Sequence, residues 1–513
     1  MPVLAANVVA SSQPLAAQAG LVAMINGGNA VDAVLTAAIA LTVVEPTGNG
    51  IGGDAFALVW DKGELRGLNG SGRSPRGWTL DYFSKYAEMP VYGWDTVTVP
   101  GAVDVWATLS DRFGRLPFAD LFKPAISYAR NGFLVSPITA RAWALAAQTY
   151  VEFENFTDAF VPGGRAPRAG ERFCSKAQAT TLESIAESRG ESFYRGELAE
   201  RIAAHATTTG GAIRMEDLAE HGSQWVEPLS QDYQGVTVHE IPPNGQGLVA
   251  LMALSMLEHL ELTRYPVDSA DSVHLQVEAI KVAFALGFRH IAEPSTMTRP
   301  SEELLDEGFL REQARNIRLD RTVSPPPVPV ENGTVYLTTA DSSGMMVSFI
   351  QSNFHGFGSG IVVPDTGISL QNRGSGFNLE PGHPNCVGPG KRPFHTIIPG
   401  FVTRNREAVM SFGVMGGHMQ PQGHVQMMVR IFGYGQNPQS ASDAPRWHVT
   451  KDFDLALEPG VDSQVKQSLR ERGHKVLEGE PVSLYGGAQA IYRLPDGYCG
   501  ASDHRKDGLA LGY

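Results

Sequence analysis

The sequence predicts an α+β fold in which helices and strands occupy separate stretches of the chain. Residues from about Pro100 to Ile317 show mainly helical patterns with short connections, clearest over 248–260 and 273–288. From Thr334 onward the pattern changes to strands. Such segregation is typical of α+β proteins. A length of 513 residues fits about three domains or one large layered fold, and we leave both open.

The N-terminal part predicts two helices. Ser11 or Ser12 can cap the first, and Gly27-Gly28 ends it. Asn29 begins a second, largely buried helix. Further helices are expected over 425–432 and over 463–472, before the closing strands.

A glycine-rich turn, 47–53, leads into a buried strand, 55–60, and a hairpin turn leads into the return strand, 65–68. The turn contains a formal G-x-G-x-x-G. It follows a helix and precedes a strand, the reverse of a dinucleotide-binding loop. We therefore interpret its glycines as a tight turn under an active site.

The most informative stretch is Gly333-Thr334, which opens a β-like run. Taken alone, the pair also fits an ordinary loop glycine before a strand. The preceding segment, 322–332, holds four prolines, which exclude a helix and favour an extended, exposed lead-in. If Thr334 attacks the carbonyl of Gly333, an N→O acyl shift and water release a new amino terminus. A free α-amine has a pKa of roughly 7.7–8.0, so the threonine would carry its own base. The strands 334–340 and 345–351 then flank a hairpin turn.

Composition narrows the classes of partner. The net charge is −13 and no run of Lys or Arg forms a stripe, which argues against nucleic acid and against an anionic membrane surface. Cys174, Cys386 and Cys499 are odd in number and far apart, which fits reduced thiols better than a disulfide framework. The first ten residues lack Lys and Arg, and no stretch reaches the roughly 18 apolar residues of a membrane span. We expect a cytoplasmic protein.

Three further features have a functional and an ordinary interpretation. Gly416-Gly417 follows an apolar strand, so its N–H groups could form an oxyanion hole or belong to a common turn. Arg73 lies just past the first hairpin, where it could bind a carboxylate or face solvent. Four histidines lack metal-ligand spacing, and we interpret them as the polar lining of a cleft: His355, His395, His418 and His424.

Taken together and in this order, these features resemble the gamma-glutamyltransferase family of N-terminal nucleophile hydrolases. The resemblance runs nearly from end to end. The segments that carry it are Val8 to Ala16, Gly27 to Ala33, Val44 to Pro46, Gly50 to Gly53, Pro100-Gly101, Pro242-Pro243, His274 to Phe284, Pro389 to Pro393 and Gly500 to Asp503.

The resemblance implies a four-layer αββα sandwich formed jointly by two segments of one precursor. Residues 1–333 would form the large subunit and residues 334–513 the small one, which has 513 − 333 = 180 residues. It implies Thr334 as nucleophile and base, and Gly416 and Gly417 as oxyanion donors. Ser352 falls where the family places a threonine that hydrogen-bonds the nucleophile. No cofactor and no metal are expected.

This sequence departs from the family around the substrate. The acidic residue that holds a substrate α-amino group in gamma-glutamyl enzymes is Gly376 here, with Arg373 nearby. The two serines after the Lys-Arg-Pro motif are His395 and Thr396. Two other positions are also altered: Arg73 lies about two residues out of register with the family's substrate arginine, and the family's asparagine beyond Ser352 is Phe354, with Asn353 beside it.

A pocket that loses a carboxylate and gains Arg373 should prefer an anionic group to an ammonium. Segments 351–360, 393–399 and 413–418 are similar to the oxamate amidohydrolase-like branch. That branch implies hydrolysis of an amide on a small acid, with an acyl-threonine intermediate. The residues expected around the substrate are Arg73, Asn353, Arg373, His395, Thr396 and His418.

Two alternatives stay open. One is a gamma-glutamyl hydrolase or transferase that acts on glutathione-type amides. The other is a processed but inactive binding protein. The expected partners are a small amide substrate and the two subunits themselves, and two processed pairs could assemble as a dimer.

Overall fold

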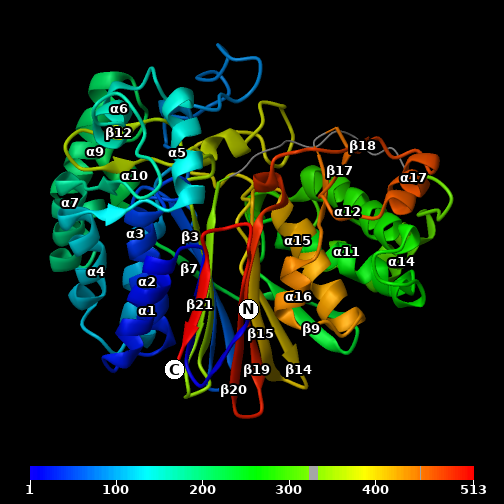
Figure 1. The fold of residues 1–513 in the computed structure, drawn as a ribbon. Coiled ribbons are helices and arrows are strands. Elements are labelled where there is room, and N and C mark those ends of the chain that lie inside the picture. The colour runs from blue at the N-terminus through cyan, green and yellow to red at the C-terminus, as the bar shows by residue number, and fades with distance from the viewer. Residues whose placement is uncertain (323–332, 451) are drawn as a thin grey trace.

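Two antiparallel seven-stranded sheets face each other at the centre of the computed structural model, which describes residues 1–322, 333–450 and 452–513 (Figure 1). The first sheet contains, in spatial order, β21 (Leu509–Gly512), β2 (Val8–Ser11), β10 (Val335–Ala340), β11 (Met346–Ser352), β3 (Asp54–Asp61), β4 (Glu64–Asn69) and β7 (Gln224–Val226). The second contains β1 (Val3–Ala5), β20 (Gly497–Ser502), β19 (Gly487–Leu494), β15 (Glu407–Met415), β14 (Gly400–Arg404), β9 (Val236–Glu240) and β8 (Leu229–Tyr233).

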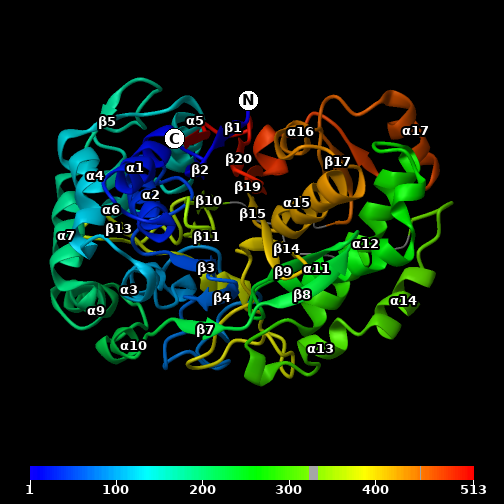
Figure 2. The same ribbon diagram turned by 90° about the horizontal axis from the view of Figure 1, so that it is seen from below.

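Helices cover the outer face of each sheet (Figure 2). On the side of the first sheet lie α1 (Pro14–Ile25), α2 (Ala30–Val44), α3 (Ala102–Phe113), α4 (Phe118–Asn131), α5 (Pro137–Thr149), α6 (Glu154–Phe160), α7 (Lys176–Ser188), α8 (Glu191–Tyr194), α9 (Glu197–Thr209) and α10 (Met215–Ala219). On the side of the second sheet lie α11 (Gly247–His259), α12 (Ala270–His290), α13 (Ser301–Leu304), α14 (Glu307–Arg315), α15 (Met419–Met428), α16 (Pro438–Asp443) and α17 (Ser463–Glu471).

Three buried apolar layers hold these elements together. One joins the first sheet to its helices, one lies between the sheets, and one joins the second sheet to its helices. Phe56 and Tyr336 of the first sheet meet Phe401 of the second in the middle layer. The architecture is the predicted α+β, αββα sandwich. Strands from both sides of the Gly333–Thr334 bond enter each sheet.

Several predicted elements are confirmed with small shifts in their ends. Asn29 caps α2 through a capping box with Asp32, and the helices predicted over 248–260, 273–288 and 463–472 are α11, α12 and α17. The hairpin of β3 and β4 also lies where it was expected.

Other predictions were wrong in detail. The cap of α1 is Gln13, because Ser11 belongs to β2. The stretch predicted as mainly helical also contains β7, β8 and β9. In the second sheet β8 is the edge strand, and β9 lies between β8 and β14. The helix expected over 425–432 begins earlier, as α15, and continues as a π-helix, η5 (Val429–Gly433). The proline segment lies outside the described residues from 323 to 332.

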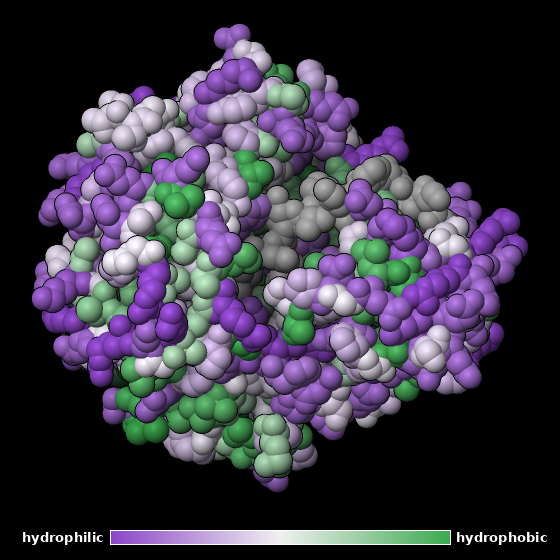
Figure 3. Space-filling model, turned by 45° about the horizontal axis from the view of Figure 1, so that its top comes forward, coloured by the Kyte–Doolittle hydropathy of each residue, from purple (hydrophilic) through white to green (hydrophobic). Residues whose placement is uncertain are grey.

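The surface in Figure 3 is mainly hydrophilic, with smaller hydrophobic groups between the polar side chains. Cys174, Cys386 and Cys499 are free thiols, as predicted. Among the helices that the structure describes, none is long and apolar enough to cross a membrane.

A buried ionic network ties the closing strands to the second helical layer. Asp503, which follows β20, accepts a hydrogen bond from Arg446 at 2.5 Å and another from Arg505 at 3.1 Å. It also accepts the backbone N–H of Ala488 at 2.7 Å. Burial alone would raise the pKa of Asp503, but the charges of Arg446 and Arg505 outweigh it and lower that pKa.

We expect Asp503→Asn to lower the free energy of unfolding by about 3–5 kcal/mol, because it leaves two buried guanidinium groups without their shared carboxylate. Urea unfolding followed by fluorescence measures this change. Asp443→Asn, at a carboxylate that is 44% exposed, is the control and should change stability by less than about 1 kcal/mol. Equal effects of the two variants would contradict the importance of the network.

Candidate active site

Thr334 lies at the entrance to β10 and is almost fully buried. The next residue, Val335, pairs with Gln351 on β11, and Ser352 pairs with Asp54 on β3. Opposite residues of an antiparallel sheet share one face. The register therefore places Thr334, Ser352 and Asp54 side by side across three strands.

The carbonyl group of Gly333 is surrounded by hydroxyl groups. Thr334 Oγ1 donates to Gly333 O at 2.6 Å, and Ser352 Oγ donates to the same oxygen at 2.6 Å. The two hydroxyl oxygens lie 3.3 Å apart. The backbone N–H of Phe354 in turn donates to Ser352 Oγ at 2.8 Å. The structure thus places the predicted nucleophile beside the bond it would cut, with a second donor on the carbonyl oxygen.

A glycine is required at Gly333, and there is little room for a side chain at Gly48. Gly333 has a φ of 149°, and a Cβ there would lie 2.3 Å from Phe354 O and 2.6 Å from Gly356 N. On the other side, a Cβ on Gly48 would lie 3.2 Å from Thr334 O. The glycine-rich turn therefore packs against the backbone of Thr334.

Gly416 and Gly417 connect β15 to α15 with φ values of 124° and 60°. Gln246 Nε2 donates to Gly417 O at 3.0 Å and holds this turn in place. Gln420, on the first turn of α15, donates from Nε2 to Thr334 Oγ1 at 3.4 Å. The turn is thereby anchored close to the nucleophile. An oxyanion role for the two glycines stays a prediction.

Arg373, at the start of the short helix η4 (Arg373–Gly376), is only 1% exposed. Its Nη1 donates to Thr396 Oγ1 at 2.6 Å, and its guanidinium carbon lies 4.5 Å from the centre of the Phe354 ring. His395 Nε2 lies 3.1 Å from Asp54 Oδ2. The structure brings three predicted residues, Arg373, His395 and Thr396, into one cluster with Asp54.

Nearby histidines are uncharged at neutral pH. Burial, reinforced by the charges of Arg373 and Arg392, lowers the pKa of His395 well below its usual value. Burial lowers the pKa of His355 to about 3 and that of His418 to about 3, and the Arg373 charge contributes to both shifts. His418 Nδ1 pairs with Gln246 Oε1 at 2.9 Å. The guanidinium of Arg373 therefore lies among neutral imidazoles and close enough to the Asp54 carboxyl to lower its pKa.

Two predicted substrate-binding residues, Asn353 and Arg73, form hydrogen bonds with residues outside the cluster around Arg373. Asn353 is fully buried and donates to Ser369 Oγ at 2.9 Å, and its amide faces the glycine-rich turn. Arg73 donates from Nη1 to Glu293 Oε2 at 3.2 Å and to Gly390 O at 2.9 Å. Their roles in substrate binding stay predictions, and Glu293 already balances the charge of Arg73.

The sequence analysis missed Asp54 and Gln420. Asp54 had a detectable signal, since a carboxylate opens an otherwise apolar strand directly after two glycines. Gln420 had none beyond its place after Gly416-Gly417. His424, which we grouped with the cleft, instead pairs with Glu240 at 2.6 Å beneath the second sheet.

One group in the described part of the chain has the composition of a metal site. Ligand atoms of His274, Glu278 and His474 lie within 4.8 Å of one another. However, Lys281 Nζ is 3.0 Å from Glu278 Oε1, and His274 Nδ1 is 2.8 Å from His474 Nε2. An ammonium group already balances the carboxylate, so we interpret this group as a buried hydrogen-bond network.

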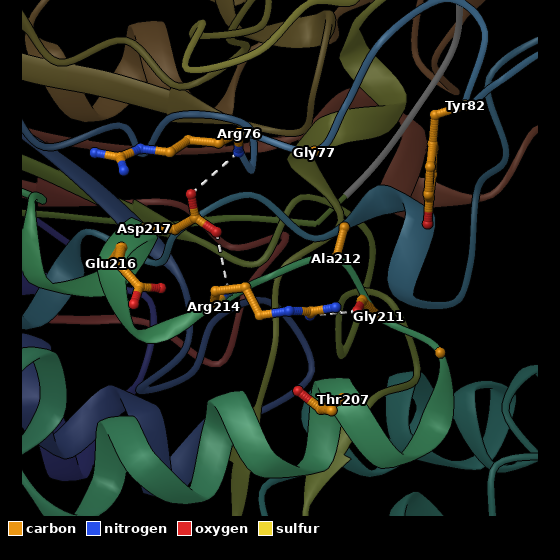
Figure 4. Close-up of a pocket in the computed structure, with 10 residues that line it drawn as sticks. Arg76, Gly77, Tyr82, Thr207, Gly211, Ala212, Arg214, Glu216 and Asp217 are labelled. Carbon is orange, nitrogen blue, oxygen red and sulfur yellow. Dashed lines mark hydrogen bonds between the residues drawn. The ribbon is translucent and has the colours of Figure 1, made fainter.

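A surface pocket of about 570 Å³ lies between the loop after β4 and helices α9 and α10 (Figure 4). Asp217 accepts the backbone N–H groups of Arg76 and Arg214 there, at 3.1 and 2.9 Å. Its lining includes none of the residues around Thr334. The candidate active site is therefore the cluster around Thr334, the predicted nucleophile, and not this pocket.

The Asp54 carboxyl should make stability depend on pH. Burial raises its pKa to about 7 from an ordinary 3.8, although the Arg373 charge and hydrogen bonds from Gly101 and Gly72 lower it. Between about pH 4 and pH 7 the folded protein holds a proton that the unfolded chain has released. This contribution to stability is complete at low pH and is lost as the pH rises toward 7.

Asp54→Asn should remove that dependence. We expect the stability of the variant, relative to wild type, to increase as the pH is raised from 5 to 8, as measured by urea unfolding at each pH. Asp61→Asn, at the partly exposed end of the same strand, is the control. Its free energy of unfolding, plotted against pH, should run parallel to that of wild type. If the stability of Asp54→Asn also ran parallel to that of wild type, the Asp54 carboxyl would not titrate between pH 5 and pH 8.

Comparison with known proteins agrees with this geometry. Residues 16–513 match the family model described as gamma-glutamyltranspeptidase. The chain is 36% identical to the glutathione hydrolase-like YwrD proenzyme of Bacillus subtilis, over 99% of this chain and 98% of that protein. It is 37% identical to the oxamate amidohydrolase proenzyme of Klebsiella pneumoniae, over 97% of each.

Among solved structures, a cephalosporin acylase from Bacillus halodurans superimposes with a TM-score of 0.95 at 48% identity, covering 100% of this chain and 97% of that one. These relatives are hydrolases, and two of them are proenzymes by name. The chain therefore belongs to the gamma-glutamyltranspeptidase family of N-terminal nucleophile hydrolases.

Proposed function

We propose that this chain is a precursor that cuts itself before Thr334 and then hydrolyses the amide bond of a small, carboxylate-bearing substrate. The observation that carries the proposal is the position of Thr334 Oγ1, 2.6 Å from the carbonyl oxygen of Gly333, with Ser352 on the same oxygen. Self-cleavage would yield a large subunit, 1–333, and a small subunit, 334–513.

Cleavage proceeds by attack of Thr334 Oγ1 on the carbonyl carbon of Gly333. The C–O bond forms, the C–N bond to Thr334 breaks, and the hydroxyl proton passes to the released nitrogen. Ser352 Oγ stabilises the negative charge that develops on the carbonyl oxygen. Water then hydrolyses the ester, and the residue becomes an amino-terminal threonine.

Turnover repeats this chemistry on a separate amide. The new α-amine takes the hydroxyl proton as Oγ1 attacks the substrate carbonyl carbon, and passes it to the departing nitrogen. The resulting acyl-threonine ester reacts with water, which releases the acid and returns the proton to Oγ1. Gly416 and Gly417 are the proposed donors to the substrate oxyanion.

The charge around Arg373 supports a substrate with a carboxylate. Arg373 lies among neutral imidazoles, Thr396 fixes its orientation, and burial keeps the nearby Asp54 carboxyl largely protonated below a pH of about 7. A buried guanidinium attracts an anionic group and disfavours an ammonium. The oxamate amidohydrolase relative, at 37% identity, supports a short acid amide. A gamma-glutamyl amide is the alternative, favoured by the name of the glutathione hydrolase-like relative.

Self-cleavage is tested by denaturing mass spectrometry of freshly made protein. Wild type should give two fragments that meet at Gly333/Thr334, and Thr334→Ala should give one uncut chain without activity. Ser352→Ala should slow cleavage by about 10²–10³, the usual cost of one oxyanion donor, whereas Ser352→Thr should retain most of the rate. Two fragments from Thr334→Ala would end the proposal, and cut but inactive wild type would favour a binding protein.

Substrate class is tested with oxamate, its neutral analogue oxamide and a gamma-glutamyl anilide. We expect wild type to prefer oxamate, and Arg373→Gln to reduce that preference by about 10–100-fold, since a hydrogen bond to a charged group contributes about 1.5–3 kcal/mol. Arg73→Gln is the matched comparison. A larger loss in Arg73→Gln would move the carboxylate site to Arg73, and preferred turnover of the anilide would support the gamma-glutamyl alternative.

A further inference from the structure

We propose that Gln420 is a catalytic residue whose side-chain N–H donates to Thr334 Oγ1 and stabilises the charge on that oxygen, both in self-cleavage and in turnover. This inference rests on the proposed role of Thr334 as nucleophile. Gln420 is fully buried and its Nε2 lies 3.4 Å from Thr334 Oγ1.

The orientation of the Gln420 amide is determined by its second contact. The backbone N–H of Ile398 donates to Gln420 Oε1 at 2.9 Å. That contact requires the oxygen of the amide on the Ile398 side. The NH₂ group must therefore face Thr334, where it is a donor and cannot accept the hydroxyl proton.

The backbone holds this donor in place. The backbone N–H of Gln420 donates to Gly417 O at 3.2 Å. This bond fixes Gln420 relative to the turn proposed as the oxyanion hole. Ile398 lies two residues beyond Thr396, the partner of Arg373. Gln420 thus connects the nucleophile to both the oxyanion turn and the proposed carboxylate site.

A donor at this position acts where charge appears on Oγ1. When water attacks the acyl-threonine, the C–Oγ1 bond breaks and its electron pair goes to Oγ1 before the proton returns. In the attack step, negative charge builds on Oγ1 as the hydroxyl loses its proton, and it decreases as the new C–O bond forms. A fixed N–H dipole lowers the energy of both transition states and requires no reorganisation. Ser352 and the glycine turn serve the carbonyl oxygen, so the two sets of donors divide the charge between them.

Gln422 is a matched control on the same helix. It is also fully buried, its Oε1 accepts the N–H of Val449 at 2.7 Å, and its Nε2 donates to His418 O at 3.1 Å. It differs from Gln420 in that its side-chain NH₂ group donates to backbone carbonyls and not to Thr334. Comparing the two separates a donor to the nucleophile from a glutamine that only holds the helix in place.

The experiment follows self-cleavage of full-length, freshly translated protein by denaturing mass spectrometry, so that no substrate has to be known. Gln420→Met removes the donor, and Gln420→Glu keeps an oxygen for Ile398 but replaces the donor by a carboxylate. We expect both to slow cleavage by about 10²–10³ at pH 8, and the cut fraction to show a lower kcat toward oxamate or the gamma-glutamyl anilide with KM within about threefold of wild type. Gln422→Met and Gln422→Glu should cleave within about threefold of wild type, even where their thermal midpoints fall.

The outcomes are distinct. Slow cleavage of the Gln420 pair with normal cleavage of the Gln422 pair supports the proposal. Normal cleavage in either Gln420 variant, or equal slowing in both pairs, overturns it. A Thr334→Ala chain assayed in parallel keeps the two hypotheses apart: if that chain is cut, the proposed function fails, whatever the Gln420 variants do.

Discussion

The site depends on the register of β10, β11 and β3. That register places Thr334 opposite Ser352 and Ser352 opposite Asp54, so that two hydroxyl groups meet at the carbonyl oxygen of Gly333. Side chains alternate between the faces of a strand, and a slip by one residue would turn Thr334 to the opposite face. The long apolar ladders on either side, buried between helices and the second sheet, make such a slip costly. The core therefore stabilises one alignment of the reacting groups.

Charge is the second constraint on this site. Burying Arg373 and Asp54 in an apolar sandwich carries a large desolvation cost. The sheet offsets part of it by placing Asp54 within reach of His395 and of the N–H of Gly101. The imidazoles stay neutral because burial and the nearby guanidinium both disfavour their protonation. This distribution of charge differs from a pocket built for an ammonium group, which supports the choice of an acid amide as substrate.

Local sequence patterns predicted many of the helices and strands, whereas the role of Thr334 came from the family resemblance and stays a prediction. Gly333-Thr334 alone was a weak signal, because the same pair also fits an ordinary loop glycine before a strand. The cap of α2 was recognisable from Asn29. What the sequence did not reveal depends on contacts between distant segments. Gln420 contacts Thr334 although 86 positions separate them in the sequence. Asp54 and His395 are in contact although they are 341 positions apart. Periodicity cannot place such pairs, and it also missed β8 and β9, which are only five residues long each.

The uncut chain also carries information about the cut enzyme. In the precursor, the carbonyl of Gly333 occupies the position that a substrate carbonyl must take if the same hydroxyl attacks both. Donors that touch Gly333 O or Thr334 Oγ1 are therefore shared by the two reactions. Arg373, which bonds to Thr396, is proposed to bind the substrate carboxylate, and self-cleavage involves no substrate. A glycine before the cut presents no side chain to this cluster, and a Cβ there would collide with the backbone of Phe354. It follows that changes in the shared donors should affect both reactions, and changes around Arg373 should affect turnover alone.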